Sequence, residues 1–355
     1  MTDQTSPTSE PILSVRNLTT GFYLREGLVA AVDDVSFDMH SGRTLAVVGE
    51  SGCGKSVTAR SVLRIVEKPG KVINGQILLR GANGETMDLA AYDQNARQLR
   101  AIRGKDIALV FQEPMTSFSN HYTIGNQIGE MLRLHLRMSK AEARARTIEV
   151  LGNVGIPSPE RRVDEYPFQL SGGLRQRVMI AMALSCRPRV LIADEPTTAL
   201  DVTTQAQILE LLKSIQQKNN MAMMLITHDM GVVAETADDV AVMYLGKLVE
   251  KGPVDEIFHD PKHPYTQALL RSIPSIRAKP RSRLPVLQGT IPSAVHKPSG
   301  CPFHPRCAHA IANVCADATP QLRAVDEKVA VSCFLHHPPQ EQQAGARPQA
   351  VEAAL

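Results

Sequence analysis

Gly49-Glu50-Ser51-Gly52-Cys53-Gly54-Lys55-Ser56 is the stretch that decides the fold of this 355-residue chain. It matches the phosphate-binding loop, in which glycines let successive backbone N–H groups point at phosphate oxygens. In such a loop Lys55 neutralises β- and γ-phosphate charge, and the Ser56 hydroxyl ligates Mg²⁺. An apolar run over 44–48 precedes the loop and a helical pattern follows it, as the motif requires. We therefore predict an ATP and Mg²⁺ site formed by Gly49, Ser51, Gly52, Gly54, Lys55, Ser56 and Val57.

Asp194 and Glu195 directly follow a second apolar run, 190–193. A carboxylate at the end of a buried strand can hold Mg²⁺, and a second carboxylate beside it can take a proton from an attacking water. The alternative is a strand that ends in a solvated acidic turn. Because a phosphate loop lies upstream, we assign Asp194 to Mg²⁺ and Glu195 to the general base.

Leu170-Ser171-Gly172-Gly173-Leu174-Arg175-Gln176 lies between these two motifs. Together the three motifs, in this order, resemble the ATP-binding cassette (ABC) transporter ATPases, and the heptapeptide resembles their signature motif. The resemblance implies that two ATP molecules lie between two head-to-tail cassettes. Ser171, Gly172 and Gly173 would then contact the ATP of the partner cassette. A helix N-terminus with two glycines and a hydroxyl suits a γ-phosphate.

Three more positions match this family by their order along the chain. Gln112 is similar to the Q-loop glutamine, which contacts Mg²⁺ and the attacking water. Asp201 is similar to the D-loop aspartate at the dimer interface, and His228 to the switch histidine that contacts the γ-phosphate. Phe22 is predicted to stack on adenine, in preference to Tyr23. The resemblance thus implies that Glu195, His228 and Gln112 are catalytic and that Ser56, Gln112 and Asp194 hold Mg²⁺.

Strand and helix patterns alternate along 12–258 and predict one α/β cassette, an ABC-type P-loop ATPase core with a mixed sheet flanked by helices. Its first runs, 12–15 and 31–37, predict an N-terminal antiparallel β region, and Asn74-Gly75 predicts a turn. The stretch of about 114–186 has a helical pattern with a capping box at Ser139 and Glu142, and predicts an inserted α-helical subdomain. Residues 1–11 and 338–355 have the composition of disordered tails.

The segment 259–337 predicts an irregular, Cys-rich C-terminal extension with one short helix that starts at His263. Four of the six cysteines gather in it: Cys301, Cys307, Cys315 and Cys333. Their spacing is not the paired C-x2-C pattern of common zinc sites. Three interpretations stay open. The resemblance implies a [4Fe–4S] cluster, which four thiolates can hold; the others are a zinc ion, and free thiols that form a disulfide on oxidation.

Four segments narrow the resemblance to the oligopeptide, dipeptide and nickel importers, and within them to the D-type ATPase subunit: 111–117, 170–178, 260–266 and 300–307. The resemblance implies an ATPase that powers solute import at the cytoplasmic face of the inner membrane. Its partners would be a related F-type ATPase, two transmembrane permease subunits and an extracytoplasmic solute-binding protein. Di- and oligopeptides are the leading solutes, with nickel and glutathione-like solutes as alternatives. Phe118-Ser119-Asn120 departs from the Leu-Asn-Pro common in this branch, which leaves the permease open.

Composition limits the other classes of function. Lys and Arg total 39 against 36 acidic residues, a net charge of +3, which gives no argument for a nucleic acid partner. We find no apolar run near the roughly 18 residues of a membrane span, and no signal peptide at the polar N-terminus. A soluble, non-transport ABC ATPase is the alternative from another class. Such proteins usually carry two cassettes or a long coiled coil, and we see neither.

Overall fold

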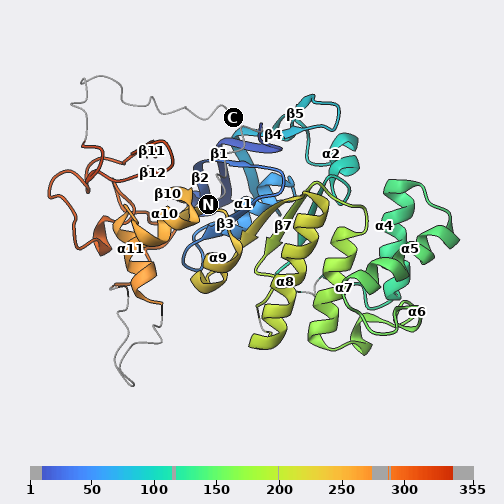
Figure 1. The fold of residues 1–355 in the computed structure, drawn as a ribbon. Coiled ribbons are helices and arrows are strands. Elements are labelled where there is room, and N and C mark those ends of the chain that lie inside the picture. The colour runs from blue at the N-terminus through green and yellow to red at the C-terminus, as the bar shows by residue number, and fades with distance from the viewer. Residues whose placement is uncertain (1–9, 114–116, 199, 274–286, 288, 339–355) are drawn as a thin grey trace.

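The main sheet is mixed and carries the predicted phosphate loop near its centre. The computed structural model describes residues 10–113, 117–198, 200–273, 287 and 289–338. In order across the sheet, its strands are β11 (Arg323–Ala324), β12 (Ala330–Val331), β10 (Lys247–Pro253), β9 (Asp239–Tyr244), β3 (Thr44–Val48), β8 (Ala222–Ile226), β7 (Val190–Asp194) and β6 (Ile107–Val110). Strands β9, β3, β8, β7 and β6 run parallel to one another, whereas the pairs β9–β10, β10–β12 and β12–β11 are antiparallel. The predicted mixed sheet is therefore confirmed (Figure 1).

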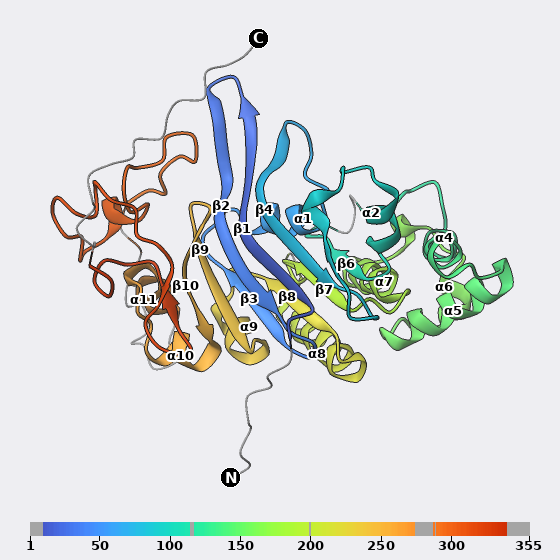
Figure 2. The ribbon, with the colours of Figure 1, turned by 90° about the horizontal axis from the view of Figure 1, so that it is seen from above.

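A second, antiparallel sheet lies over the main sheet and confirms the predicted N-terminal β region. Its strands, in order, are β2 (Gly27–Met39), β1 (Leu13–Leu24), β4 (Gly70–Arg80) and β5 (Thr86–Asp88). Strands β1 and β2 form a long hairpin that extends past the main sheet (Figure 2).

The turn predicted at Asn74-Gly75 is wrong, because both residues lie inside β4. The register between β1 and β4 shifts there, between the pairs Arg16–Gln76 and Thr19–Asn74. Gly75 has a φ of 99° and lies against the backbone of Asn17 and Leu18, where a side chain would clash. The pair that reads as a turn is therefore a β-bulge that bends the strand.

The helices divide into those of the core, those of the C-terminal extension and those of the inserted region. The core helices are α1 (Lys55–Val62), η1 (Leu89–Ala91), α2 (Arg97–Ile102), α8 (Val202–Asn219), α9 (Met230–Thr236) and α10 (Val254–His259). The extension contains α11 (Pro264–Arg271) and η3 (His304–Arg306). The inserted region contains α4 (Ile124–Leu136), α5 (Lys140–Asn153), α6 (Pro159–Arg162), η2 (Pro167–Gln169) and α7 (Gly172–Leu184). The capping box predicted at the start of α5 is present, with both Ser139 and Glu142 bonds formed.

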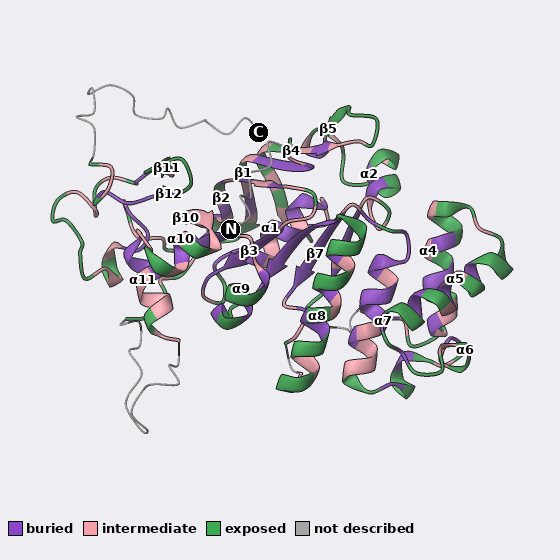
Figure 3. Ribbon diagram, in the orientation of Figure 1, coloured by how far each residue is buried: buried purple, intermediate pink, exposed green. Residues whose placement is uncertain are grey.

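Alternating side chains of the main strands enter different parts of the core. On β7, Val190 and Ile192 pack with α1 and the antiparallel sheet, whereas Leu191 and Ala193 pack with α7 and α8. A third cluster joins β3 and β9 to α9, α10, α11 and the Cys-rich segment. Figure 3 shows the strands buried and the outer faces of the helices exposed. Because side chains alternate with a period of two along each strand, both faces of the sheet are buried against other elements.

The C-terminal extension is tied to the core sheet more closely than the sequence predicts. Strand β12 pairs with β10, with Val331 opposite Glu250, and β11 pairs with β12. Strands of two residues have no detectable periodicity, so the sequence could not predict them. The predicted short helix is α11, which begins after His263 as expected. Of the predicted tails, 1–9 and 339–355 lie outside the described residues. Among the described residues, no helix is long and apolar enough to cross a membrane.

Candidate ATP site

The phosphate loop joins β3 to α1 and turns through three glycines with positive φ: Gly49, Gly52 and Gly54. Gly54 packs against the carbonyl of Ala31, where a side chain would clash. The Lys55 side chain is buried and folds over the loop, because its Nζ donates to the carbonyls of Gly49 (2.7 Å) and Glu50 (3.0 Å). The loop therefore has the backbone conformation and the cation that a phosphate chain needs.

Ser56 and Asp194 meet at the start of α1 and the end of β7. The Ser56 Oγ donates to the Asp194 Oδ1 at 2.9 Å. Asp194 is only 6% exposed, and burial raises the pKa of its carboxyl, while the Ser56 hydrogen bond opposes that shift. A hydroxyl and a buried carboxylate placed together are hard oxygen ligands of the kind that Mg²⁺ prefers.

Three residues surround the carboxylate of Glu195. The Gln112 Nε2 and the Thr198 Oγ1 donate to its Oε2, at 2.8 and 2.9 Å. The His228 Nδ1 lies 3.4 Å from its Oε1. Glu195 itself adopts a left-handed backbone conformation, with φ at 45°, which is uncommon outside glycine and collects at functional sites. The structure therefore brings Gln112, Glu195 and His228 together, and adds Thr198, which the sequence analysis missed.

The signature segment lies at the exposed N-terminus of α7. Ser171 caps this helix, its Oγ accepting the N–H of Leu174 at 3.4 Å. Ser171 and Gly172 are exposed. Asp201 caps α8 in the same way, accepting from the N–H (3.0 Å) and hydroxyl (2.7 Å) of Thr204. These residues thus have local capping roles, and their contact with a partner cassette stays a prediction.

Phe22 and Tyr23 differ in exposure on β1. Phe22 is half-buried with its ring beside Gly70, whereas Tyr23 is 55% exposed. The contact of Phe22 with Gly70 is a packing contact, so its predicted role at adenine stays untested.

An open groove of about 450 Å³ lies between the core and the inserted helices. Most of its lining is apolar, and its walls come from β6, α4 and α7, with Phe111, Met131, Leu134, Met179 and Met182 among the lining residues. Leu134 is 70% exposed and Phe111 is 37% exposed. Because Phe111 precedes Gln112, the groove is adjacent along the chain to the residues around Glu195.

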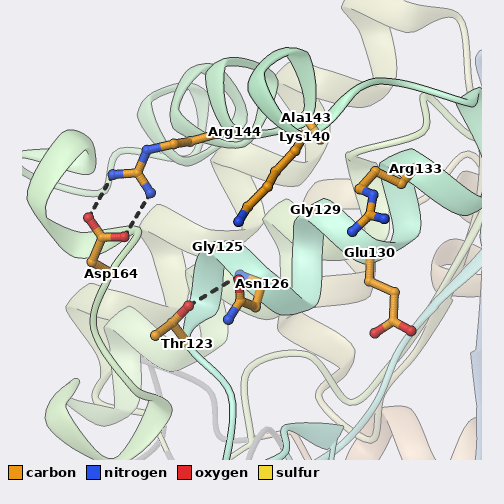
Figure 4. Close-up of a pocket in the computed structure, with 10 residues that line it drawn as sticks. All are labelled: Thr123, Gly125, Asn126, Gly129, Glu130, Arg133, Lys140, Ala143, Arg144 and Asp164. Carbon is orange, nitrogen blue, oxygen red and sulfur yellow. Dashed lines mark hydrogen bonds and ion pairs between the residues drawn. The ribbon is translucent and has the colours of Figure 1, made fainter.

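A smaller cavity, of about 90 Å³, lies between α4 and α5 (Figure 4). Lys140 extends toward it, and Arg144 forms a bidentate pair with Asp164, at 2.7 and 2.6 Å. Thr123 caps α4 at its edge by accepting the N–H of Asn126. The lining residues all come from the inserted region, so this cavity is separate from the predicted ATP site.

The four C-terminal cysteines lie close to one another and are all free thiols. Each sulfur accepts a backbone N–H: Cys301 from Phe303, Cys307 from His309, Cys315 from Ile311 and Cys333 from Leu335. Burial raises the pKa of Cys301 to about 11 and also raises the pKa values of Cys307 and Cys333. Within the part of the chain that the structure describes, no three His, Cys, Asp or Glu residues are arranged around a single metal ion.

Comparison with known proteins identifies the class. The ABC transporter family model matches residues 32–198, and the model of the oligopeptide/dipeptide transporter C-terminal region matches residues 249–315. A dimeric ABC transporter cassette, MJ0796, is similar in structure, with a TM-score of 0.60 and 27% identity, over 68% of this chain and 98% of that one. A second structure of that cassette is titled as a dimeric post-hydrolysis state bound to ADP and Pi, with the same scores.

The chain belongs to the ABC transporter ATPases, and it is an ATP-binding and ATP-hydrolysing protein of that family. The dipeptide transport ATP-binding protein DppD of Bacillus subtilis is 47% identical over 327 residues, which cover 92% of this chain and 95% of that relative. The oligopeptide transport ATP-binding protein AppD of the same organism is 48% identical over 326 residues, covering 92% and 97%. DppD of Haemophilus influenzae is 46% identical over 331 residues, covering 93% and 97%.

Proposed function

We propose that this protein is the ATP-hydrolysing subunit of an importer for di- and oligopeptides, bound at the cytoplasmic face of the inner membrane. The observation that carries the catalytic part is the carboxylate of Glu195, held by Gln112 and Thr198 beside His228. The solute class is supported by the relatives DppD and AppD, whose names give dipeptide and oligopeptide transport. Nickel and glutathione-like solutes are the alternatives. The cassette would span 12–258 and the extension 259–337.

In this proposal the residues of the site divide the work of hydrolysis. The loop amides and Lys55 would bind the phosphates, and Ser56, Asp194 and Gln112 would hold Mg²⁺. Mg²⁺, when bound, neutralises charge on the β- and γ-phosphates. Glu195 accepts a proton from the attacking water, while Gln112 orients that water and His228 contacts the γ-phosphate. Phe22 stacks on adenine.

The partners follow from two surfaces. The exposed N-terminus of α7, with Ser171, Gly172 and Gly173, would face the ATP of a second, F-type ATPase, and Asp201 would lie at the same interface. The apolar groove beside Phe111 would receive one of the two permease subunits, because it opens next to the Gln112 segment. Closure around ATP would then move the inserted helices and the groove together. A solute-binding protein would deliver the peptide outside the membrane.

We also propose a [4Fe–4S] cluster on Cys301, Cys307, Cys315 and Cys333. The backbone N–H donated to each sulfur stabilises a thiolate, and burial keeps the unbound thiols Cys301, Cys307 and Cys333 protonated until a metal displaces the protons. The alternatives are a zinc ion, which would need all four sulfurs about 2.3 Å from one point, and free thiols that form a disulfide on oxidation. Anaerobic purification should yield about four iron and four sulfide per chain. Zinc alone, or no metal, would contradict the cluster.

The test of the main proposal is uptake of labelled di- and oligopeptides, with nickel in parallel, in cells that carry the wild-type chain or Glu195→Gln. We expect the variant to bind ATP and to lose peptide uptake by about 100-fold or more, since it lacks the general base. Glu210→Gln, at an exposed position of α8, is the matched control. Loss of nickel uptake alone would move the substrate, and no change in either would favour the soluble, non-transport ATPase.

A further inference from the structure

Glu50, in the phosphate loop, has its backbone N–H and its carboxylate bound by the C-terminal extension. Its N–H donates to the Tyr265 hydroxyl at 2.9 Å. Its carboxylate accepts two bonds from Arg306, at 2.6 and 3.0 Å. Its carbonyl accepts from Lys55 inside the loop. The loop is therefore held from within by its own lysine and from outside by residues more than 200 positions away in sequence.

The Arg306 side chain is buried and is also held by Tyr244, in addition to its pair with Glu50. Its side chain is 3% exposed, and the Glu50 side chain is 21% exposed. The Arg306 guanidinium lies 5.9 Å from the centroid of the Tyr244 ring and donates to the Tyr244 hydroxyl at 3.3 Å. A bidentate, charge-assisted pair in such a buried position is geometrically specific, unlike an exposed ion pair, which contributes little.

The surroundings of Arg306 connect the pair to the rest of the extension. Phe303 packs against Tyr244 and Tyr265, with ring centroids 5.3 Å from each. The short helix η3 begins one residue after Phe303 and ends at Arg306, so Cys301 and Cys307 flank this turn of chain. A group bound by those two thiols would therefore also restrain the position of Arg306.

We propose that Arg306 is a positioning residue for the ATPase reaction, which holds the phosphate loop in its ATP-binding shape through Glu50. A loop with three positive-φ glycines has many conformations open to it. Restraining Glu50 lowers the entropy that the loop loses when its amides close on phosphate. The C-terminal extension is then part of the structural support of the ATP site. The inference rests on the ATPase activity of the family and is independent of the solute.

Equilibrium binding of a fluorescent ATP analogue with Mg²⁺ to the full-length chain tests this role. We expect Arg306→Met to weaken binding about tenfold, the effect of losing one charge-assisted pair. Arg306→Lys should recover part of the affinity, since lysine keeps the positive charge but cannot form the bidentate pair of a guanidinium. Arg323→Met, at an exposed position of the same extension, should leave the affinity unchanged. Unchanged affinity in Arg306→Met would overturn the proposal.

A double-mutant cycle separates positioning from general damage to the fold. Glu50→Gln should weaken binding as Arg306→Met does, and the double variant should be no weaker than either single variant, because the two share one interaction. Losses that multiply would contradict the pair. In the assembled complex, Arg306→Met should raise KM for ATP and change kcat little. A lower melting temperature with normal affinity, measured well below melting, would show a purely structural role and overturn the proposal.

Discussion

The two carboxylate oxygens of Glu195 have different surroundings. Gln112 and Thr198 both donate to Oε2, whereas Oε1 has His228 Nδ1 at 3.4 Å. In the proposed reaction Oε1 is therefore the oxygen better placed to accept a proton from water. Thr198 holds the carboxylate in this orientation from three residues away, and its hydroxyl does not need to touch the substrate to matter.

Asp194 gives a prediction that separates Mg²⁺ binding from nucleotide binding. Asp194→Asn keeps an acceptor for the Ser56 hydroxyl but removes the charge. We expect the affinity for ATP to fall about tenfold in the presence of Mg²⁺ and to stay unchanged in excess EDTA. Asp255→Asn, at an exposed position in the first turn of α10, is the control. Equal losses with and without Mg²⁺ would contradict the assignment.

The same residue gives this binding a pH dependence of known sign. Burial raises the pKa of Asp194, so its carboxyl takes up a proton at a higher pH than an ordinary aspartate does. The protonated form cannot hold a cation, and Mg²⁺-dependent affinity should therefore fall as the pH falls. Asp194→Asn should remove this part of the pH dependence. Titrations of ATP binding at several pH values, with Mg²⁺ or EDTA, measure both effects.

At the residue scale, the sequence predicted the residues of the ATP site but not the side chains that hold them in position. Motif order placed Gln112, Glu195 and His228 in one site, and the structure brings their side chains together. The Arg306–Glu50 pair was not predicted, because 256 positions separate the two residues and neither belongs to a shared pattern. Thr198 follows Glu195 by three residues, and attention to turn contacts could have found it.

At the element scale, the start of α11 depends on a buried histidine. His263 is 1% exposed, and its Nδ1 accepts the N–H of Tyr265 at 3.0 Å, which caps the helix. The backbone N–H of His263 donates to the buried carboxylate of Glu250 at 3.0 Å. Burial lowers the pKa of His263 from 6.5 to about 3, and the nearby His336 adds to this shift. The folded protein therefore requires a neutral imidazole here.

The consequence is that the free energy of unfolding should decrease as the pH falls. Below about pH 6.5 the unfolded chain binds a proton at His263, and the folded chain does not until about pH 3. The free energy of unfolding should therefore fall by about 1.4 kcal/mol per pH unit between these values. His263→Asn keeps a capping acceptor and should remove that slope, whereas exposed His121→Asn should not. Denaturant melts from pH 7.5 to 4.5 measure it; parallel curves for His263→Asn and wild type would contradict it.

Elements with a local signal could be predicted, and those without one could not. The capping box at Ser139 predicted the start of α5, and the short helix predicted to start at His263 is α11. The β-bulge at Gly75 has the same letters as a turn, because both need a positive φ, so only the partner strand distinguishes them. Strand β12 exists only through its pairing with β10, in which Val331 lies opposite Glu250 across 81 positions of sequence, and β11 exists only through its pairing with β12.

At the scale of the whole molecule, the inserted helices and the C-terminal extension have different roles. The inserted helices lie at one end of the main sheet and the C-terminal extension at the other, with the phosphate loop between them (Figure 1). The extension supports the loop through Glu50, while α7 presents an exposed N-terminus. The sequence predicted the inserted helices from their helical pattern and the extension from its composition, but the positions of both relative to the loop depend on strand order, which no local pattern encodes.

Gly172 provides the prediction that tests association. A methyl group at this position would meet nothing within 4 Å in the chain itself. Packing inside the chain therefore does not require glycine at the start of α7, and alanine is the better helix former. If a partner's γ-phosphate lies against this turn, the methyl group would obstruct it. Gly172→Ala should thus keep the melting temperature and the affinity of the chain's own ATP site.

ATP-dependent association with the partner ATPase should instead weaken about tenfold or more in Gly172→Ala, since the donors at the helix N-terminus lose close approach to phosphate. Sedimentation with Mg²⁺ and ATP in a Glu195→Gln background, which slows hydrolysis, measures the effect. Gly152→Ala, an exposed glycine in α5 with only an ordinary contact to Pro159, is the matched control. Normal association of Gly172→Ala would contradict the prediction. It would mean that the N-terminus of α7 does not contact the partner's nucleotide.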